Sequence, residues 1–257
     1  MQTVQSADGT TIVFEAEGEG PALVLVTGAF CDRHTSAALA ARLASRFTVY
    51  RYDRRGRGDS TDAATYSVAR EVEDLDAVIT AAGGTASAYG HSSGAVLVLV
   101  AAAAGSAIDK LAAYEPPFVE DNSRPRHGSD LADRLSDLVA AGHRGEAADR
   151  FLTEAVGLPP QALDSIHRSP GWPAMLTIAH TLAYDVILSN NQTIPDGLER
   201  ISVPVLLLAG GASPEWARSA IESLALVIPR SQTVVLDGQT HGVADDAIVP
   251  VIEDFLL

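Results

Sequence analysis

The sequence of 257 residues predicts an α/β fold, in which a mostly parallel twisted sheet is flanked by helices and carries a helical lid. Short apolar or β-branched stretches alternate with helical patterns in both end parts of the chain, which is typical of right-handed β–α–β units. Between about residues 117 and 200 this alternation stops and only helical patterns occur. We therefore expect a core domain of residues 1–117 and 200–257 and a lid of residues 118–199, inserted after the strand that ends near Tyr114.

The first predicted elements lie between residues 10 and 52. Thr10–Glu17 is predicted as a strand because it follows the Asp8-Gly9 turn, and Ala22–Val26 is a short apolar run typical of a buried strand. Ser36–Ser45 has leucines at helical spacing. The β-branched and aromatic residues of Phe47–Tyr52 favour a strand.

The next elements include two different helical patterns. Val68–Ala82 repeats its apolar residues along one face, which predicts an amphipathic helix. Ser93–Ala104 is apolar almost throughout, which predicts a helix that is buried on all sides. Strands are predicted before and after this buried helix, at Thr85–Tyr89 and Lys110–Tyr114.

The lid and the last part of the chain are predicted from the same patterns. Lid helices are expected at Leu131–Ala140, Glu146–Ala155, Pro160–Ile166 and Pro173–Leu188. Strands are then expected at Val203–Ala209 and Gln232–Leu236, and helices at Glu215–Ile228 and Ala247–Phe255. The histidines of the lid share no tight metal-ligand spacing, so we expect no metal.

Composition excludes several classes of partner. The chain carries 33 acidic residues against 18 basic ones, a formal net charge of −15, and nucleic acids and anionic membranes both demand a basic surface. The single cysteine, Cys31, excludes an intramolecular disulfide and a cysteine-built metal site. The amino terminus does not resemble a signal peptide, and the apolar run Ala95–Ala104 is too short to span a bilayer. We expect a cytoplasmic protein that acts on a small molecule without a cofactor, and a homodimer stays open.

The stretch Gly90-His91-Ser92-Ser93-Gly94 carries the strongest chemical signal. It matches the pattern G-x-S-x-G between a predicted strand and a predicted helix, where a sharp turn lifts the serine hydroxyl above the sheet. The alternative is a structural turn that contains glycines. A serine hydroxyl needs a base at neutral pH, and His241 lies on the predicted loop before the last helix. We therefore predict Ser92 as a nucleophile and His241 as its base.

On these residues the chain resembles the α/β-hydrolase superfamily, which implies the α/β-hydrolase fold. Three further stretches carry the resemblance, namely the strand and loop of residues 24–29, the segment of residues 52–60, which is similar to D-x-R-G-x-G-x-S, and the histidine loop of residues 238–242. The resemblance also implies an oxyanion hole formed by the backbone N–H groups of Ala29 and Ser93. Thr27 stands where the family's oxyanion motif often has a histidine.

The acid of the expected triad departs from the family pattern. The family usually places an aspartate where this chain has Ser213, and serine cannot stabilise an imidazolium as a carboxylate does. Some members carry the acid at the end of the strand after the nucleophile helix, where this chain has Glu115. We predict Glu115 as the triad acid, with Glu215 as the alternative and Asp237 as a weaker one. In another interpretation Glu115 only caps the exit into the lid.

The substrate pocket is expected between the nucleophile and the lid. His180 and Tyr184 share one helix face at spacing i, i+4 and are predicted to reach this pocket, although packing against the core domain explains them equally well. Trp172 of the lid is predicted to line it as well. Phe30, next to the predicted oxyanion loop, is expected to form part of its wall.

These residues predict a cofactor-independent serine hydrolase that acts through an acyl-enzyme on Ser92. Because the lid offers apolar and aromatic residues and no basic cluster, the expected substrate is a small to medium, mostly apolar ester, lactone or thioester. Two alternatives stay open. A carbon–carbon bond hydrolase or lyase uses the same parts, and a non-hydrolytic ligand-binding protein explains the changes at Thr27 and Ser213.

Overall fold

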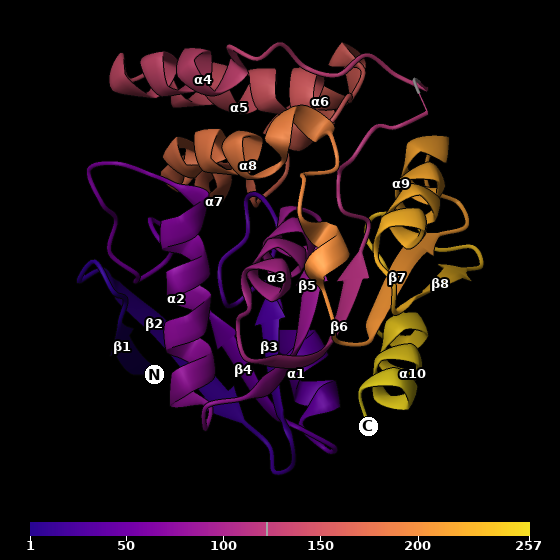
Figure 1. The fold of residues 1–257 in the computed structure, drawn as a ribbon. Helices are drawn as coiled ribbons and strands as arrows, with labels where there is room; N and C mark the ends of the chain where they lie inside the picture. Colours follow the sequence, from indigo (N-terminus) through magenta and orange to yellow (C-terminus); the bar gives the residue numbers. More distant parts are fainter. Residues whose placement is uncertain (122) are drawn as a thin grey trace.

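The computed structural model describes residues 1–121 and 123–257 and has one eight-stranded sheet at its centre (Figure 1). The strands are β1 Gln2–Gln5, β2 Thr11–Glu17, β3 Ala22–Val26, β4 Thr48–Tyr52, β5 Ala86–His91, β6 Ile108–Tyr114, β7 Val205–Gly210 and β8 Ser231–Leu236. Their order in the sheet is β1-β2-β4-β3-β5-β6-β7-β8. The β1–β2 and β2–β4 pairs are antiparallel and the other pairs are parallel. The expected mostly parallel sheet is confirmed.

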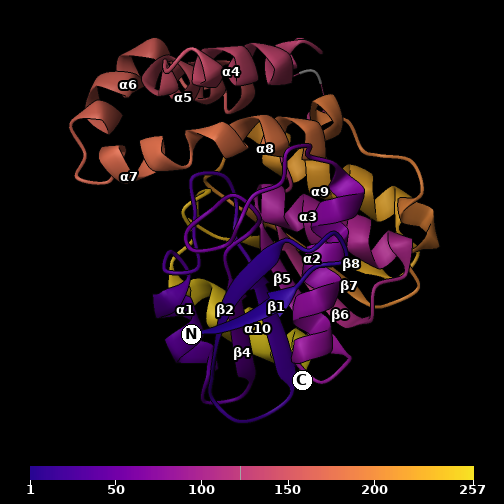
Figure 2. The ribbon, with the colours of Figure 1, turned by 90° about the vertical axis from the view of Figure 1, so that its left-hand side faces the viewer.

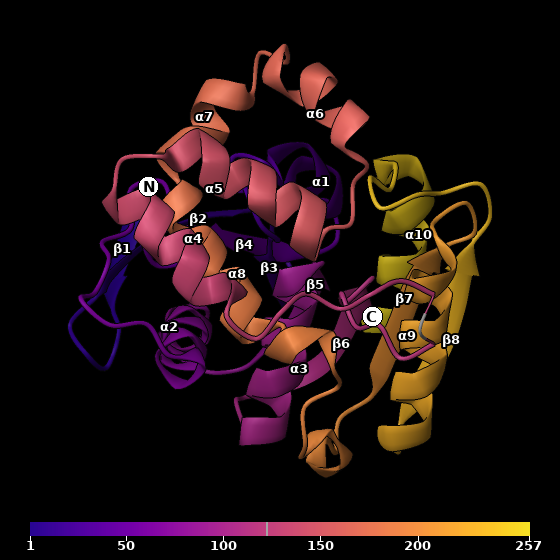
Figure 3. The ribbon, with the colours of Figure 1, turned by 90° about the horizontal axis from the view of Figure 1, so that it is seen from above.

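Helices cover both faces of this sheet. They are α1 Ala37–Leu43, α2 Val68–Ala81, α3 Ser93–Ala104, α9 Glu215–Val227 and α10 Asp245–Leu256. In the view from above, α2, α3 and α9 lie on one face of the sheet and α1 and α10 on the other (Figure 3). The apolar residues of the first group join one buried core, and those of the second group join another. The all-apolar α3 is buried because it lies between β5 and β6 on one side and the neighbouring helices α2 and α8 (Leu182–Leu188) on the other.

The lid covers the carboxyl ends of the parallel strands (Figures 1 and 2). Its elements are α4 Leu131–Ala140, α5 Arg144–Arg150, a π-helical turn Phe151–Ala155, α6 Pro160–His167, α7 Trp172–Thr177, a 3₁₀ turn Ala179–Thr181 and α8. Leu131, Leu135, Phe151 and Leu182 close a separate small core inside the lid. Phe118 and Leu188, near the two ends of the expected lid segment, pack instead into the core of the sheet domain.

Two elements differ from the sequence expectations. β1 is polar and mostly exposed, so no apolar pattern marks it, and pairing with β2 makes it a strand. The expected helix Pro173–Leu188 is interrupted, because α7 ends at Thr177 and α8 begins at Leu182. Thr177 and Thr181 each bind a backbone carbonyl oxygen through their hydroxyls at this break, and such bonds compete with continuous helix. In the described part of the chain, no helix has the length and apolar character needed to cross a membrane.

Candidate active site

Ser92 lies on the turn between β5 and α3. Its φ of 57° and ψ of −123° lie outside the ordinary regions for a residue with a side chain. The flanking glycines are required by space, because a Cβ at Gly90 would lie 2.4 Å from the carbonyl oxygen of Gly94, and a Cβ at Gly94 would lie 2.2 Å from that of Val26. The turn therefore brings α3 against β3 and leaves Ser92 at the carboxyl edge of the sheet.

His241 and Glu115 are joined by a hydrogen bond of 2.6 Å between His241 Nδ1 and Glu115 Oε2. Glu115 directly follows β6, is fully buried and has a left-handed φ of 47°. Its other carboxylate oxygen accepts a hydrogen bond of 2.8 Å from the backbone N–H of Gly210. Burial by itself raises the pKa of Glu115, but these hydrogen bonds, first that of His241, bring it below its ordinary value. The ionised carboxylate thus orients the imidazole ring with its proton on Nδ1.

The position where the family usually has its aspartate holds no carboxylate. The Ser213 hydroxyl is buried and lies close enough to Glu115 to help lower the pKa of that carboxyl. Glu215 is the first residue of α9, and Asp237 follows β8. Within residues 1–121 and 123–257, neither of these two carboxylates forms an ion pair with His241, whereas Glu115 does.

His91, the residue before Ser92, supports the histidine loop. Its Nε2 donates a hydrogen bond of 2.8 Å to the backbone carbonyl oxygen of His241, and its ring packs on Tyr114 with 5.5 Å between centroids. The Tyr114 O–H donates in turn to the carbonyl oxygen of Thr240 at 2.6 Å. Burial, with a smaller contribution from His241, lowers the pKa of His91 to about 4, so this ring is neutral at pH 7.

Ser92 and His241 lie on neighbouring loops at the same edge of the sheet. Among the described residues, no hydrogen bond joins the Ser92 hydroxyl to the His241 ring. Because Nδ1 of His241 binds Glu115, Nε2 is the nitrogen left to accept a proton, and the side chain is 44% exposed. Hydrogen bonds of catalytic serines often tighten only when substrate binds.

The predicted oxyanion loop packs directly against Ser92, the predicted nucleophile. A Cβ at Gly28 would lie 2.9 Å from Cβ and 3.4 Å from Oγ of Ser92, so only glycine leaves the hydroxyl room. The backbone N–H groups of Ala29 and Ser93 donate to no other group in the described part of the chain. Ser93 is the first residue of α3, where the helix itself offers its N–H no partner. Both N–H groups are therefore available to an oxygen bound beside Ser92.

Two cavities border this region. The larger, of about 610 Å³, lies between core loops and the lid, and its wall includes Phe30, Met175, Ile178 and His180. The smaller, of about 220 Å³, is bounded by His91 and His241 and by apolar residues of β3, α1 and α10. Phe30 has a left-handed φ of 58° and packs edge-on against Phe151 of the lid, with 5.5 Å between ring centroids. This contact joins the oxyanion loop to the lid.

The other predicted pocket residues of the lid are bound to protein groups. Tyr184 donates a hydrogen bond of 3.0 Å to Asp62 Oδ2, and His180 Nε2 lies 3.5 Å from the same oxygen. Tyr184 also stacks on Tyr66, with 4.3 Å between ring centroids. The two alternatives for these residues are lining the pocket and packing against the core domain. Tyr184 packs against the core domain, whereas His180 both reaches Asp62 and lines the larger cavity.

Trp172 begins α7 and packs beside the His167 ring, with 4.5 Å between centroids. Neither Trp172 nor Tyr184 belongs to the described walls of these two cavities. Across residues 1–121 and 123–257, no group of three or more His, Cys, Asp or Glu side chains has the arrangement of a metal site.

A family model described as "Alpha/beta hydrolase family" matches residues 23–253. The chain belongs to this family. An alpha/beta hydrolase from Sphaerobacter thermophilus DSM 20745 is 50% identical, with a TM-score of 0.95 over 100% of both chains. The esterase RhEst1 from Rhodococcus sp. ECU1013 is 23% identical, with a TM-score of 0.71 over 99% of this chain and 98% of that chain, a likeness of fold.

A curated relative of this alpha/beta hydrolase matches only in part. The protein named "Probable oxidoreductase EphD" from Mycobacterium tuberculosis (strain ATCC 25618 / H37Rv) is 42% identical over 82 residues. The match covers 30% of this chain and 14% of the relative's length. The resemblance to α/β-hydrolases is thus confirmed, and family membership supports hydrolase activity of unspecified reaction.

Sequence reasoning missed the buried ion pairs that lie next to the predicted nucleophile turn of this hydrolase. Arg54 and Arg57 occupy two of the three variable positions of the D-x-R-G-x-G-x-S segment, and both are buried. Because a buried arginine needs a carboxylate partner, two buried arginines in this segment could have indicated nearby buried carboxylates. Their partner Asp185 lies 131 residues from Arg54 along the chain, so local pattern does not identify it.

Proposed function

We propose that this protein is a cofactor-independent serine hydrolase that forms an acyl-enzyme on Ser92. The observation that carries the proposal is the 2.6 Å hydrogen bond between His241 and the buried Glu115, on loops adjacent to a serine held at a strained turn. A base oriented by a carboxylate beside a nucleophile is the arrangement that activates a serine hydroxyl.

In the proposed reaction, Ser92 Oγ attacks the carbonyl carbon of the substrate while His241 Nε2 accepts the hydroxyl proton. Glu115 stabilises the imidazolium that forms. The N–H groups of Ala29 and Ser93 bind the oxyanion of the tetrahedral intermediate, and each such donor contributes about 3–4 kcal/mol in comparable sites. The imidazolium returns its proton to the leaving alcohol or thiol. A water molecule, deprotonated by His241, then releases the acid and restores Ser92.

The proposed substrate is a small to medium, mostly apolar ester, lactone or thioester. The larger cavity supports this class, since Phe30, Met175 and Ile178 give it apolar walls beside the oxyanion loop. The described wall of this cavity has two histidines but no lysine or arginine, so a strongly anionic substrate finds no permanent positive charge there. His180 and Asp32 add polar groups to the same wall.

Covalent labelling tests the proposal. A fluorophosphonate probe is expected to label the wild-type protein at Ser92, and Ser92→Ala is expected to lose both the label and the hydrolysis of p-nitrophenyl esters. A folded wild-type protein that is not labelled contradicts the hydrolase proposal and favours the ligand-binding alternative. Labelling without turnover of any ester, lactone or thioester favours carbon–carbon bond cleavage.

A further inference from the structure

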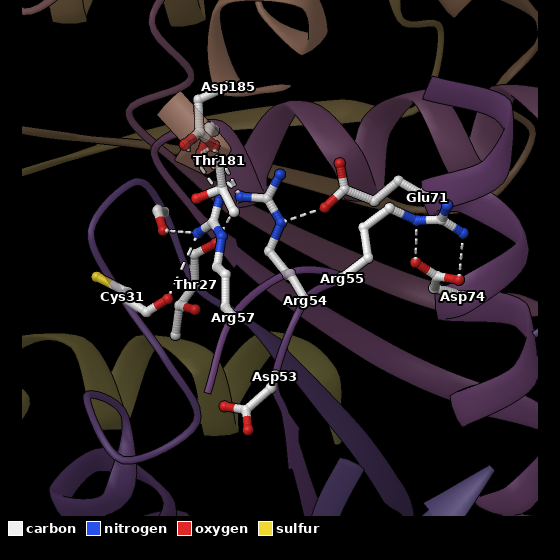
Figure 4. A network of polar contacts seen from close by, with 12 residues as sticks. Thr27, Cys31, Asp53, Arg54, Arg55, Arg57, Glu71, Asp74, Thr181 and Asp185 are labelled. Atoms are coloured by element: carbon white, nitrogen blue, oxygen red, sulfur yellow. Dashed lines mark hydrogen bonds and ion pairs between the residues drawn. The ribbon is translucent and has the colours of Figure 1, made fainter. Parts of the chain in front are cut away.

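Two arginines and two carboxylates are buried together where the lid meets the core (Figure 4). Arg54 and Arg57 lie on the loop after β4, Glu71 lies on α2 and Asp185 lies on α8 of the lid. None of these side chains is more than 2% exposed. Removing four charges from water is costly.

Asp185 is the point at which the contacts of this cluster converge. Its two carboxylate oxygens lie 2.8 and 2.9 Å from Arg57 Nη2, and Oδ1 also accepts from Arg54 Nη1 at 2.9 Å. The same Oδ1 accepts a hydrogen bond of 2.7 Å from the hydroxyl of Ser93, the residue after the nucleophile. Burial by itself raises the pKa of Asp185, but Arg57 and Arg54 bring it below its ordinary value. A charged lid residue therefore binds Ser93 directly.

Arg57 connects the same carboxylate to the oxyanion loop. Its Nη1 donates to the carbonyl oxygen of Gly28 at 2.5 Å. That oxygen and the N–H of Ala29 belong to one planar trans peptide, in which they point in opposite directions. Fixing the Gly28 carbonyl toward Arg57 therefore fixes the Ala29 N–H on the other side of the peptide. Arg54 Nη1 also donates to the carbonyl oxygen of Thr27 at 3.3 Å.

We propose that Asp185 is a positioning residue of the lid that sets the geometry of the oxyanion hole at both of its donors. It holds Ser93 through the Ser93 hydroxyl, and it holds the Gly28–Ala29 peptide through Arg57. The inference rests on the proposed function, because it gives Ala29 and Ser93 their role. Donors that are fixed before reaction act on the transition state, since they need no reorganisation when charge develops.

A matched control exists one residue away. Arg55 pairs with Asp74 through two hydrogen bonds of 2.7 Å, and both side chains are 0% exposed. Arg55 extends away from Arg54 and Arg57 (Figure 4). In the described residues, neither Arg55 nor Asp74 binds Gly28 or Ser93. Asp185→Asn and Asp74→Asn thus each replace a buried carboxylate that binds arginine, but only the first touches the oxyanion hole.

The test compares kcat and KM of Asp185→Asn, Asp74→Asn and Ser93→Ala on a p-nitrophenyl ester, together with thermal unfolding of each. For Asp185→Asn we expect kcat to fall about 10- to 100-fold with little change in KM, a smaller loss than that of a whole oxyanion donor. For Ser93→Ala, which keeps the backbone N–H, we expect a loss of about fivefold, the size of one hydrogen bond. Asp74→Asn is expected to lower the unfolding temperature and leave kcat unchanged.

Binding of a trifluoromethyl ketone gives a second measurement. Its adduct on Ser92 places an oxyanion in the hole, so its affinity is expected to fall with kcat in Asp185→Asn and to stay unchanged in Asp74→Asn. Equal kcat in Asp185→Asn and wild type, or equal losses in Asp185→Asn and Asp74→Asn, overturns the inference. If Asp185→Asn does not fold, an unchanged kcat in Ser93→Ala overturns it. If a fluorophosphonate does not label the wild-type protein, the proposed function and this inference both fail. If it does label the wild type, the kinetic comparison of the variants tests this inference alone.

Discussion

His91 Nε2 donates a hydrogen bond to the backbone carbonyl oxygen of His241, so the residue before the predicted nucleophile supports the predicted base. Tyr114 does the same for the neighbouring Thr240. The histidine loop is thus held by side chains from β5 and β6, the two strands that Ser92 and Glu115 directly follow.

The lowered pKa of His91 predicts a loss of stability in acid. Its pKa of about 4 lies below the ordinary value of 6.5, so between these values the unfolded chain binds a proton that the folded protein does not. The free energy of unfolding is therefore expected to fall as the pH falls from 6.5 to about 4, by at most about 3 kcal/mol. Urea denaturation at several pH values measures it. His91→Gln is expected to weaken the dependence of the unfolding free energy on pH. His34→Gln, at an exposed histidine, is expected to leave this dependence unchanged.

Glu115→Gln tests the acid of the triad. An amide presents the wrong partner to His241 Nδ1, and in a comparable triad the corresponding change lowers kcat about 10⁴-fold. We expect a fall of at least about 100-fold in kcat with a similar KM. Glu215→Gln, on α9, is expected to keep the wild-type kcat. The reverse pattern, with loss in Glu215→Gln alone, contradicts the assignment.

Gly94 is predicted to tolerate no side chain. A Cβ there would lie 2.2 Å from a backbone oxygen of β3, so Gly94→Ala is expected to lower the free energy of unfolding by about 2–3 kcal/mol or more. Gly145, on α5, has no atom within 4 Å of an added Cβ. Gly145→Ala is expected to raise stability by about 0.5–1 kcal/mol. Thermal unfolding of both variants measures these changes in stability. Equal changes in Gly94→Ala and Gly145→Ala would contradict the steric explanation for Gly94.

Tyr184 is predicted to hold the lid and not the substrate. Tyr184→Phe loses the hydrogen bond to Asp62 but keeps the stacked contact with Tyr66. We expect unchanged KM for an apolar ester and faster amide exchange in α8, and Tyr184→Ala is expected to accelerate exchange further. A raised KM in Tyr184→Phe without faster exchange would instead place the hydroxyl at the substrate.

The sequence predicts best what is local. Gly90 and Gly94 flank Ser92 at fixed spacing, and the steric reason for Gly90 lies within one strand, one turn and one helix, whereas that for Gly94 is a contact with β3. The alternation of apolar runs predicts the parallel sheet for a similar reason, because each buried strand must be apolar on both faces. β1 could not be predicted in this way, because an exposed edge strand needs no apolar residues.

Contacts between distant segments are harder to predict. Glu115 is one of several carboxylates near strand ends, and the hydrogen bonds from His241 and Gly210 single it out only when the loops are folded. Asp185 carries no local signal at all, because its partners Arg57 and Ser93 lie 128 and 92 residues away. The break between α7 and α8 depends on local threonine bonds that compete with a strong helical pattern.

The position of Glu115 bears on how this scaffold could be altered. On the proposed assignment, the loop between β7 and α9 carries no catalytic carboxylate, but the Gly210 N–H binds Glu115 and the Ala212 N–H binds the carbonyl oxygen of Gln239. New recognition sequence can therefore be inserted after Ser213 with little risk to the chemistry. The opposite holds after β6, where Glu115 is followed at once by Pro116 and Pro117 and then by the chain that enters the lid. A transplanted lid therefore has to be joined beyond Pro117, with the buried glutamate and its stiff proline exit left to the recipient.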